Sequence, residues 1–359
     1  MTYLVAPQFP VAAVNPCGLD GLDFVEFVSN EPARLDALFK AFGFSKTKRH
    51  RDKPIDLYQQ GDITFLLNRE PHSFAARFGE LHGPSICSMG WRCKDATQAH
   101  AAAVSRGARS QAEGDFLIDR QYPMPAIFGI GDSLIYFVDH AGHADTWARR
   151  GFEDLTEPEL VLAKGFLALD HLTNNVAKGT MQHWASFYKD VFGFAEVRYF
   201  DIRGAKTGLT SYALRSPCGR FCIPINEADE KKSQINEYLD EYHGPGIQHL
   251  AFITQDLLAS LQQLEGSSIT MLDIDADYYA EVFDRVPNVS EDHAEIKRRN
   301  VLVDGDADGY LLQIFTKNLV GPIFIELIQR KNHASFGEGN FGALFRSIER
   351  DQARRGLFD

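Results

Sequence analysis

The chain has 359 residues, of which 44% are hydrophobic and 24% are charged, and this composition excludes an extended disordered protein. Its formal net charge of −12 argues against partners such as nucleic acid or an anionic membrane surface. Five cysteines without a CxxC pair exclude a zinc ribbon and predict reduced thiols.

The length exceeds that of one typical hydrophobic core, so we expect two domains. No apolar run reaches the ~18 residues that a membrane span requires. The N-terminal segment MTYLVAPQFP also lacks the basic start of a secretory signal. We therefore expect a cytoplasmic protein that does not insert into a membrane.

The first half of the chain predicts short strands that alternate with helices. The strand GLDFVEFVSN (21–30) precedes a helix near 31–42 that ends at Phe-Gly-Phe, where the glycine suits a helix C-cap. A strand within 82–95 precedes a helix near 95–106, and another strand lies within 131–140.

A linker is predicted near 150–160, because GFEDLTEPEL is acidic and turn-like. We therefore expect one domain at 1–155 and a second at 156–359.

The second half predicts the same order of elements. A strand at 168–176 precedes a helix near 181–192, which again ends at Phe-Gly-Phe. A strand within 243–256 precedes a helix near 256–265, and a last strand lies within 321–331. After it, the glycine-rich GEGNF and ALFRSIERDQ predict a hinge before an amphipathic helix, which either covers a pocket or simply docks as a terminal helix.

The two halves are similar enough to indicate an internal repeat. HGPSICSMGWRCKD (82–95) matches HGPGIQHLAFITQD (243–256) without a gap, at an offset of 161 residues. A strand–helix–strand unit of this kind cannot close a core alone. The repeat therefore predicts paired modules whose curved sheets surround a central cavity.

Comparison of the halves singles out two histidines. His249 has Ser88 as its counterpart at the 161-residue offset, and His171 has Phe24 in the matching Leu-Asp stretch. A single histidine on an apolar strand is more often a hydrogen-bonded core residue than a ligand. The difference between the halves favours metal binding, and only in the second half.

A third possible ligand lies in GPIFIELIQRK, where Glu326 aligns with about Phe137 of the first half. Two imidazoles and one carboxylate on three strands of one sheet form the facial triad of non-haem Fe(II) oxygenases. This triad leaves three adjacent coordination positions open for substrate and dioxygen. We predict one Fe(II) per subunit, bound by His171, His249 and Glu326.

Longer stretches resemble the 4-hydroxyphenylpyruvate dioxygenase family of the vicinal oxygen chelate superfamily. The likeness covers nearly the whole chain and is strongest from about residue 168 onward. The stretches are LDHLTNNV (169–176), YFDIRGAKTGLTSYAL (199–214), PINE (224–227), GIQHLAF (246–252), LLQIFTK (311–317), GPIFIELIQRK (321–331) and GEGNFGALFRSIERDQ (337–352).

The resemblance implies an α+β fold of two tandem vicinal-oxygen-chelate domains, each made of paired βαβββ modules that form an open curved barrel. It implies that the N-terminal domain is metal-free, that the C-terminal domain binds Fe(II) and is catalytic, and that a C-terminal helix covers the active site. It also implies a substrate pocket lined by Ser211, Asn226, Gln234, Gln313, Phe324, Asn340 and Phe341.

The implied reaction is the Fe(II)-dependent conversion of 4-hydroxyphenylpyruvate and O2 to homogentisate and CO2 in tyrosine catabolism. It combines oxidative decarboxylation, ring hydroxylation and side-chain migration. The expected partners are a small α-keto acid, O2 and further copies of the chain in a dimer or tetramer. Three alternatives stay open: a 4-hydroxymandelate synthase, an extradiol ring-cleaving dioxygenase, and a metal-free protein that binds aromatic compounds.

Overall fold

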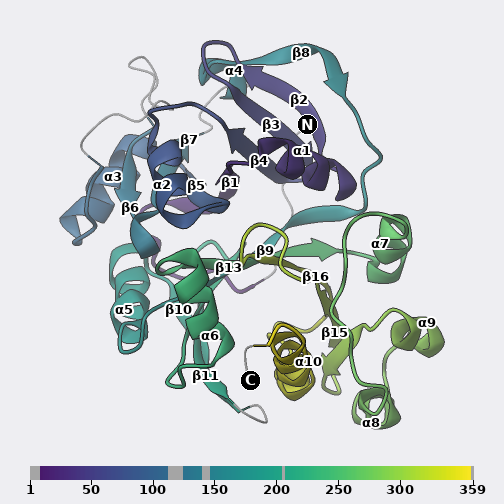
Figure 1. Cartoon of the computed structure of the whole chain (residues 1–359). Helices are drawn as coiled ribbons and strands as arrows, with labels where there is room; N and C mark the ends of the chain where they lie inside the picture. The colour runs from purple at the N-terminus through teal and green to yellow at the C-terminus, as the bar shows by residue number, and fades with distance from the viewer. Residues whose placement is uncertain (1–8, 112–123, 140–145, 204–206, 357–359) are drawn as a thin grey trace.

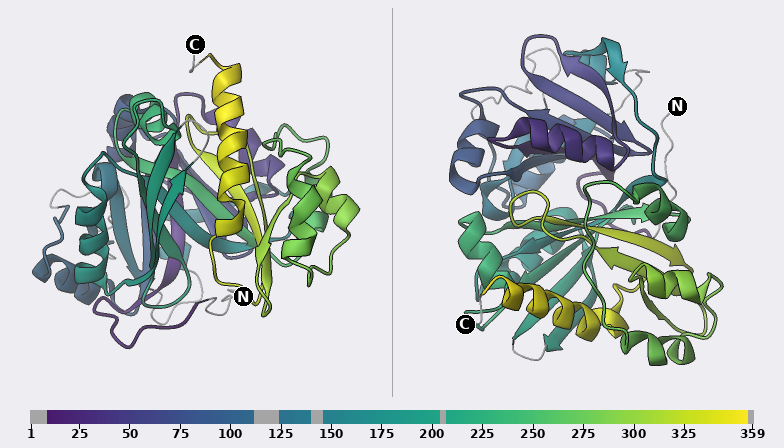
Figure 2. Two further views of the ribbon diagram at one scale, coloured as in Figure 1. Left: turned by 90° about the horizontal axis from the view of Figure 1, so that it is seen from below. Right: turned by 45° about the vertical axis from the view of Figure 1, so that its right-hand side comes forward.

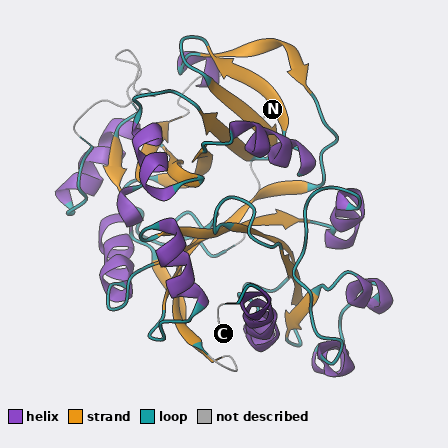
Figure 3. Cartoon of the chain, in the orientation of Figure 1, coloured by secondary structure: helices purple, strands orange, loops and turns teal. Residues whose placement is uncertain are grey.

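The computed structural model describes residues 9–111, 124–139, 146–203 and 207–356, which form two eight-stranded sheets flanked by helices (Figure 1). One sheet comes from each half of the chain, and Figure 3 shows the strands of both halves in orange. Among the described helices, none is long and apolar enough to cross a membrane.

The first sheet has β1 and β5 at its centre, paired in antiparallel fashion. Each of these strands has a parallel neighbour, β4 for β1 and β7 for β5. Across the sheet the order is β6 (Ala126–Phe128), β7 (Leu134–Asp139), β5 (Ser85–Cys93), β1 (Leu19–Val28), β4 (Ile63–Asn68), β3 (Ile55–Gln60), β2 (Ser45–His50) and β8 (Phe152–Glu159).

The second sheet repeats this plan with β9 and β13 at its centre and with β12 and β16 as their parallel neighbours. Across the sheet the order is β10 (Ala195–Arg203), β11 (Gly208–Arg215), β12 (Cys222–Glu227), β9 (Phe166–Asn175), β13 (Gly246–Thr254), β16 (Phe324–Lys331), β15 (Tyr310–Phe315) and β14 (Leu302–Gly305).

The helices confirm the predicted order of elements. All four helices predicted inside the repeats are present, as α1, α3, α5 and α7, and the predicted C-terminal helix is α10. The helices are α1 (Pro32–Ala41), α2 (Phe74–His82), α3 (Ala96–Ser105), α4 (Thr146–Arg149), α5 (Met181–Phe192), α6 (Gln234–Tyr242), α7 (Leu257–Leu264), α8 (Tyr278–Arg285), α9 (His293–Arg298) and α10 (Phe341–Arg354).

Two glycines end helices as the sequence predicts. Gly193 is the left-handed C-cap of α5, with φ +78, and Gly43 follows the C-cap of α1 with φ +88. Glycine adopts this backbone without steric cost, so the chain can turn sharply into the next strand.

The fold class is therefore confirmed: α+β, with two tandem curved sheets, each built from paired modules in which a strand, a helix and further strands follow one another. The halves share one core at their contact. Phe42 and Phe44 pack edge-on against Phe252, with ring centroids 5.6 and 5.8 Å apart. This aromatic contact fixes the second sheet against the first.

The segment predicted as a linker is in fact largely β8, an edge strand of the first sheet that pairs with β2. Its acidic residues face lysines: Lys46 lies opposite Glu159, and Lys48 opposite Asp154. This segment looks turn-like by itself, but cross-strand ion pairs stabilise it as a strand. The sheet changes between β8 and β9, and the division at 155 and 156 stays a prediction.

The strand register confirms one pair of counterparts and shifts another. Phe24 stands opposite Gly90 as His171 stands opposite Ala251, so Phe24 is the counterpart of His171. In the parallel pairs, Gly90 faces Tyr136 where Ala251 faces Glu326. The counterpart of Glu326 is therefore Tyr136 and not the neighbouring Phe137, because the loops before the last strands differ in length.

Candidate metal centre

Three adjacent strands of the second sheet carry the three predicted ligands. His171 on β9 and Glu326 on β16 flank Ala251 of β13, and His249 lies two residues before Ala251 on the same face of that strand. All three side chains therefore point to one side of the sheet. The small side chain of Ala251 leaves the space between them open.

The donor atoms of the three side chains form a compact triangle. Nε2 of His171 lies 3.0 Å from Oε2 of Glu326 and 3.3 Å from Nε2 of His249. Nε2 of His249 lies 3.4 Å from the same glutamate oxygen. In the described part of the chain, this is the one group of three His, Cys, Asp or Glu side chains placed to hold a metal ion, and all three are buried.

The triangle fits a divalent transition-metal ion. With metal–ligand bonds of about 2.1 Å, neighbouring ligands lie about 3.0 Å apart around an octahedral ion and about 3.4 Å apart around a tetrahedral one. The three separations fall in this range. A buried carboxylate also needs a positive charge beside it, which a metal ion supplies. The residues present therefore fit the iron that the sequence predicts.

The pKa values of the three groups reflect their burial and their mutual contacts. Burial alone would raise the pKa of Glu326, but the two imidazoles outweigh it and lower this pKa to about 2. Burial alone would lower the pKa of His171, but Glu326 and Asp170 outweigh it and raise this pKa to about 9. At His249 burial dominates and lowers the pKa. The raised pKa of His171 favours its protonated form when no metal is bound, and a metal that binds Nε2 would displace this proton.

Each imidazole is oriented by the residue that precedes it. Nδ1 of His171 donates to Oδ2 of Asp170 at 2.8 Å, and Nδ1 of His249 donates to Oε1 of Gln248 at 3.0 Å. With a hydrogen held on Nδ1, the Nε2 atom of each ring can present its lone pair to a metal. Burial would raise the pKa of Asp170, but Arg330 outweighs it and keeps this pKa low.

The triangle forms part of the wall of a pocket of about 640 Å³, which is mostly apolar. Helix α10 runs across the concave side of the second sheet (Figure 2). Side chains of this helix form one wall of the pocket. Its contributions come from one helix face, at spacings of three and four residues. They are Phe341, Leu344, Phe345 and Ile348.

Five of the predicted pocket residues lie in this wall. Ser211 on β11 stands directly opposite Asn226 on β12, so the hydroxyl and the amide face the pocket side by side. Gln234 begins α6, Phe324 begins β16 and Phe341 begins α10. The structure thus brings these five residues together with the three candidate ligands.

Two other predicted pocket residues lie next to the wall but not in it. Gln313 is 1% exposed, with its amide group against Gly337, and neither amide atom has a hydrogen-bond partner in the described residues. Oδ1 of Asn340 accepts hydrogen bonds from Tyr278 at 2.6 Å and from Arg285 at 3.3 Å. Asn340 therefore anchors the start of α10.

Sequence reasoning missed several residues of this site. Gln248 directly precedes His249, lines the pocket, and its Oε1 also lies 3.5 Å from Nδ2 of Asn226. The i, i+3, i+4, i+7 spacing in FGALFRSI identifies the pocket face of α10, and alternation along β15 places Phe315 beside Gln313. No local pattern indicates Phe336, which lies in a loop.

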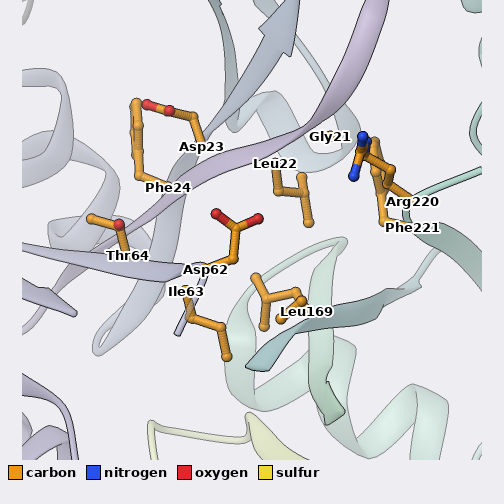
Figure 4. Close-up of a pocket in the computed structure, with 11 residues that line it drawn as sticks. Gly21, Leu22, Asp23, Phe24, Asp62, Ile63, Thr64, Leu169, Arg220 and Phe221 are labelled. Atoms are coloured by element: carbon orange, nitrogen blue, oxygen red, sulfur yellow. The ribbon is translucent and has the colours of Figure 1, made fainter. Parts of the chain in front are cut away.

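A second pocket, of about 450 Å³, lies between the halves and is shown in Figure 4. Asp23, Asp62 and Arg220 lie along it. Its carboxylates are already paired with arginines, since Arg92 donates two hydrogen bonds of 2.8 Å to Asp62. This pocket is held together by ion pairs and lacks the donor triangle of the first.

Family profiles match both halves of the chain. The profile described as "Hydroxyphenylpyruvate dioxygenase, HPPD, N-terminal" matches residues 13–153. The profile of the "Glyoxalase/Bleomycin resistance protein/Dioxygenase superfamily" matches residues 168–314. Together they cover most of both sheets but not β16, the strand that carries Glu326.

Two relatives are similar over nearly the full length. Protein MelA of Shewanella colwelliana is 57% identical over 344 residues, which cover 96% of this chain and 98% of that protein. The 4-hydroxyphenylpyruvate dioxygenase of Legionella pneumophila (strain Philadelphia 1) is 44% identical over 347 residues, which cover 95% of this chain and 97% of the enzyme.

Solved structures share the fold. A fusion protein of a xylose isomerase-like TIM barrel and 4-hydroxyphenylpyruvate dioxygenase matches with a TM-score of 0.79 and 30% identity, over 96% of this chain but 54% of the longer fusion. A mutant of 4-hydroxymandelate synthase from Streptomyces coelicolor matches with a TM-score of 0.77 and 25% identity, over 93% of this chain and 99% of that chain.

Proposed function

The chain belongs to the 4-hydroxyphenylpyruvate dioxygenase family, and from this premise we propose that it is itself a 4-hydroxyphenylpyruvate dioxygenase. It converts 4-hydroxyphenylpyruvate and O2 to homogentisate and CO2, using one Fe(II) held by His171, His249 and Glu326. The observation that carries this proposal is the buried triangle of donor atoms in a chain that is 44% identical to an enzyme of that name.

The donor set suits the proposed metal. Two neutral imidazoles and one carboxylate leave a net charge of about +1 on a divalent ion, which attracts an anionic α-keto acid. Fe(II) held by these three residues would supply the redox chemistry that activates dioxygen next to a bound keto acid.

The residues of the chain bind and orient the substrate. Phe324 and Phe341 enclose its aromatic ring, and the paired Ser211 and Asn226 with Gln234 hydrogen-bond its phenol. Positioning matters because an aromatic ring displaced by about 1 Å reacts much more slowly or at another atom. The apolar wall contributed by α10 excludes water from the reacting carbons.

Although Gln313 lies beside the pocket wall and not in it, we propose that its amide makes a further polar contact to the bound substrate. Its amide is buried without a partner in the described residues, and such an arrangement costs about 1 to 3 kcal/mol unless a ligand satisfies it. A polar group of the substrate would do so. We also propose that the enzyme acts in the cytoplasm, in tyrosine catabolism, as a homo-oligomer, whose size light scattering after gel filtration would give.

The direct test is product analysis with purified protein, Fe(II), ascorbate, O2 and 4-hydroxyphenylpyruvate. The proposal predicts homogentisate as the main product, with one O2 consumed for each CO2 released. Absence of turnover in protein that has taken up iron would contradict it.

The main alternative is 4-hydroxymandelate synthase, because a mutant of such an enzyme is among the structural matches. It would use the same site on the same substrate but oxidise the benzylic carbon, so chromatography that finds 4-hydroxymandelate would replace our proposal by this one. Oxidation of catechols would instead indicate an extradiol dioxygenase. Binding of the keto acid without iron would indicate a metal-free binding protein.

A further inference from the structure

A buried ion pair stands directly behind the first candidate ligand. Asp170 is fully buried and accepts the Nδ1 hydrogen of His171. Arg330 holds the same carboxylate as a fork, because its Nε and Nη2 atoms each donate a hydrogen bond of 2.8 Å, one to each oxygen. The two residues are 160 positions apart, on β9 and β16.

The third nitrogen of Arg330 reaches the loop that leads to α10. Nη1 donates to the backbone oxygen of His333 at 3.1 Å and to that of Ser335 at 2.5 Å. The next residue, Phe336, lies in the pocket wall, with its ring 5.5 Å from the imidazole of His171. The Arg330 guanidinium lies 5.8 Å from the centre of the same ring. The Arg330 guanidinium thus contacts both Asp170, which orients a candidate ligand, and Phe336 of the pocket wall.

We propose that Arg330 is a positioning residue that fixes the His171 imidazole, through Asp170, and the loop 333–336 in one arrangement, so that metal binding and the order of this loop are coupled. The inference rests on the proposed metal site and adds to it the residues that set its geometry. It assigns no contact between Arg330 and substrate.

The fork geometry is the physical reason for this role. A planar guanidinium that donates two parallel hydrogen bonds fixes both the position and the plane of a carboxylate, whereas an ammonium fixes only a distance. The carboxylate then fixes the ring of His171 and keeps its hydrogen on Nδ1. Loss of such an outer partner typically lowers metal affinity by about 10- to 100-fold.

A purely structural ion pair is the competing explanation, and the repeat offers a matched control. Asp23 precedes Phe24 as Asp170 precedes His171, and Figure 4 shows Asp23 and Phe24 on β1. Asp23 is also buried and paired, since Arg150 donates to it at 2.6 Å and Arg92 at 3.4 Å. This pair stands behind a phenyl ring that cannot bind metal.

The test compares Asp170→Asn with Asp23→Asn in the full chain, using Mn(II) binding followed by electron paramagnetic resonance and thermal melting of both proteins. We expect Asp170→Asn to lower Mn(II) affinity by about 10- to 100-fold. Asp23→Asn should lower the melting temperature but change the affinity by less than about twofold. Equal affinities for both variants and the wild type, or equal losses in both variants, would overturn the inference.

Arg330→Lys tests the coupling even where Asp170→Asn folds poorly. In the wild type, Mn(II) should slow amide hydrogen exchange in 333–336. In Arg330→Lys this protection should be lost, and the affinity for Mn(II) should fall by at least about tenfold. Unchanged protection in Arg330→Lys would overturn the inference while the metal site stands. A wild type that binds no Mn(II) would instead contradict the proposed function.

Discussion

The two sheets place different side chains at the same three positions, and the difference decides which one can bind a metal. In the second sheet the positions hold His171, His249 and Glu326. In the first sheet they hold Phe24, Ser88 and Tyr136. The rings of Phe24 and Tyr136 lie 6.0 Å apart, and that of Trp147 lies 5.9 Å from Phe24, so aromatic rings fill the centre.

The residue that lies between these positions is Gly90 in the first half and Ala251 in the second, and its size suits the side chains around it. A Cβ atom added to Gly90 would lie 2.4 Å from the ring of Phe24, so that ring needs glycine beside it. The counterpart Ala251 lies between His171 and Glu326 and carries only a methyl group. One backbone therefore carries a packed core in the first half and the candidate metal site in the second.

The largest effect is expected from removal of the carboxylate. Glu326→Ala leaves two ligands, so metal binding should become undetectable and kcat/KM for homogentisate formation should fall by at least about 1000-fold. Tyr136→Phe, at the counterpart position, should leave both unchanged. Iron titration and product chromatography measure this, and near-normal turnover of Glu326→Ala would remove this residue from the site.

In the first half, we expect a substitution to lower the stability of the protein and to leave its metal binding unchanged. Phe24→Ala empties the centre of the aromatic cluster and should lower the free energy of unfolding by about 3 to 5 kcal/mol. Its affinity for metal should stay that of the wild type. Urea denaturation and metal titration check this pair of outcomes, and a loss of metal binding in a folded Phe24→Ala protein would mean that the halves are not independent.

As the pH rises, the stability of the metal-free protein should fall, whereas its affinity for metal should increase. The folded pKa of His171, about 9, lies above the unfolded value of 6.5. In the metal-free protein its charge therefore adds stability that is complete below pH 6.5 and is lost as the pH rises through 9. Metal must displace this proton, so affinity should rise up to about tenfold per pH unit until pH 9.

Parallel melting curves and metal titrations from pH 6 to 9 check both signs. For the melting curves, His171→Gln serves as the control, because it keeps a polar side chain but has no proton to release. Affinity of the wild type that does not change over this range would mean that His171 is not a ligand.

The smallest effect is expected at the cover of the pocket. Arg350 on α10 donates to the carboxylate of Asp275 at 2.5 Å and to the backbone oxygen of Asp273 at 2.8 Å. This half-exposed contact is worth at most about 1 kcal/mol. Arg350→Ala should therefore raise KM by up to about fivefold with little change in kcat.

Steady-state kinetics measure this change, with Arg34→Ala as the control. Arg34 forms a more exposed ion pair with Glu31 in the first half and does not line the pocket. A similar rise in KM for Arg34→Ala, or no rise for Arg350→Ala, would argue against a role of this contact in closing the pocket.

The sequence predicted those parts of the fold that repeat or that carry local signals. The helices that end at Gly43 and Gly193 are present, and comparison of the two halves identified the three candidate ligands that meet in the second sheet. Helices α2 and α6 could have been predicted as well, because Ser73 and Ser233 cap them shortly before the two His-Gly-Pro stretches.

The parts that could not be predicted depend on partners distant in sequence. β8 becomes a strand through lysines of β2, over 100 residues earlier in the chain. Arg330 meets Asp170 across 160 positions, and Asn340 is drawn to Tyr278 and Arg285 of α8, in a segment with no diagnostic pattern. Such contacts leave no local signal in composition or periodicity.

Anaerobic titration tests the central claim most directly. Fe(II) is added to the wild type and to His249→Ala, and 4-hydroxyphenylpyruvate follows. We predict that the wild type binds about one Fe(II) per chain and gains a charge-transfer absorption band when the keto acid is added, while His249→Ala does neither. A wild type without saturable iron binding, or a His249→Ala protein with the same band, would contradict the account.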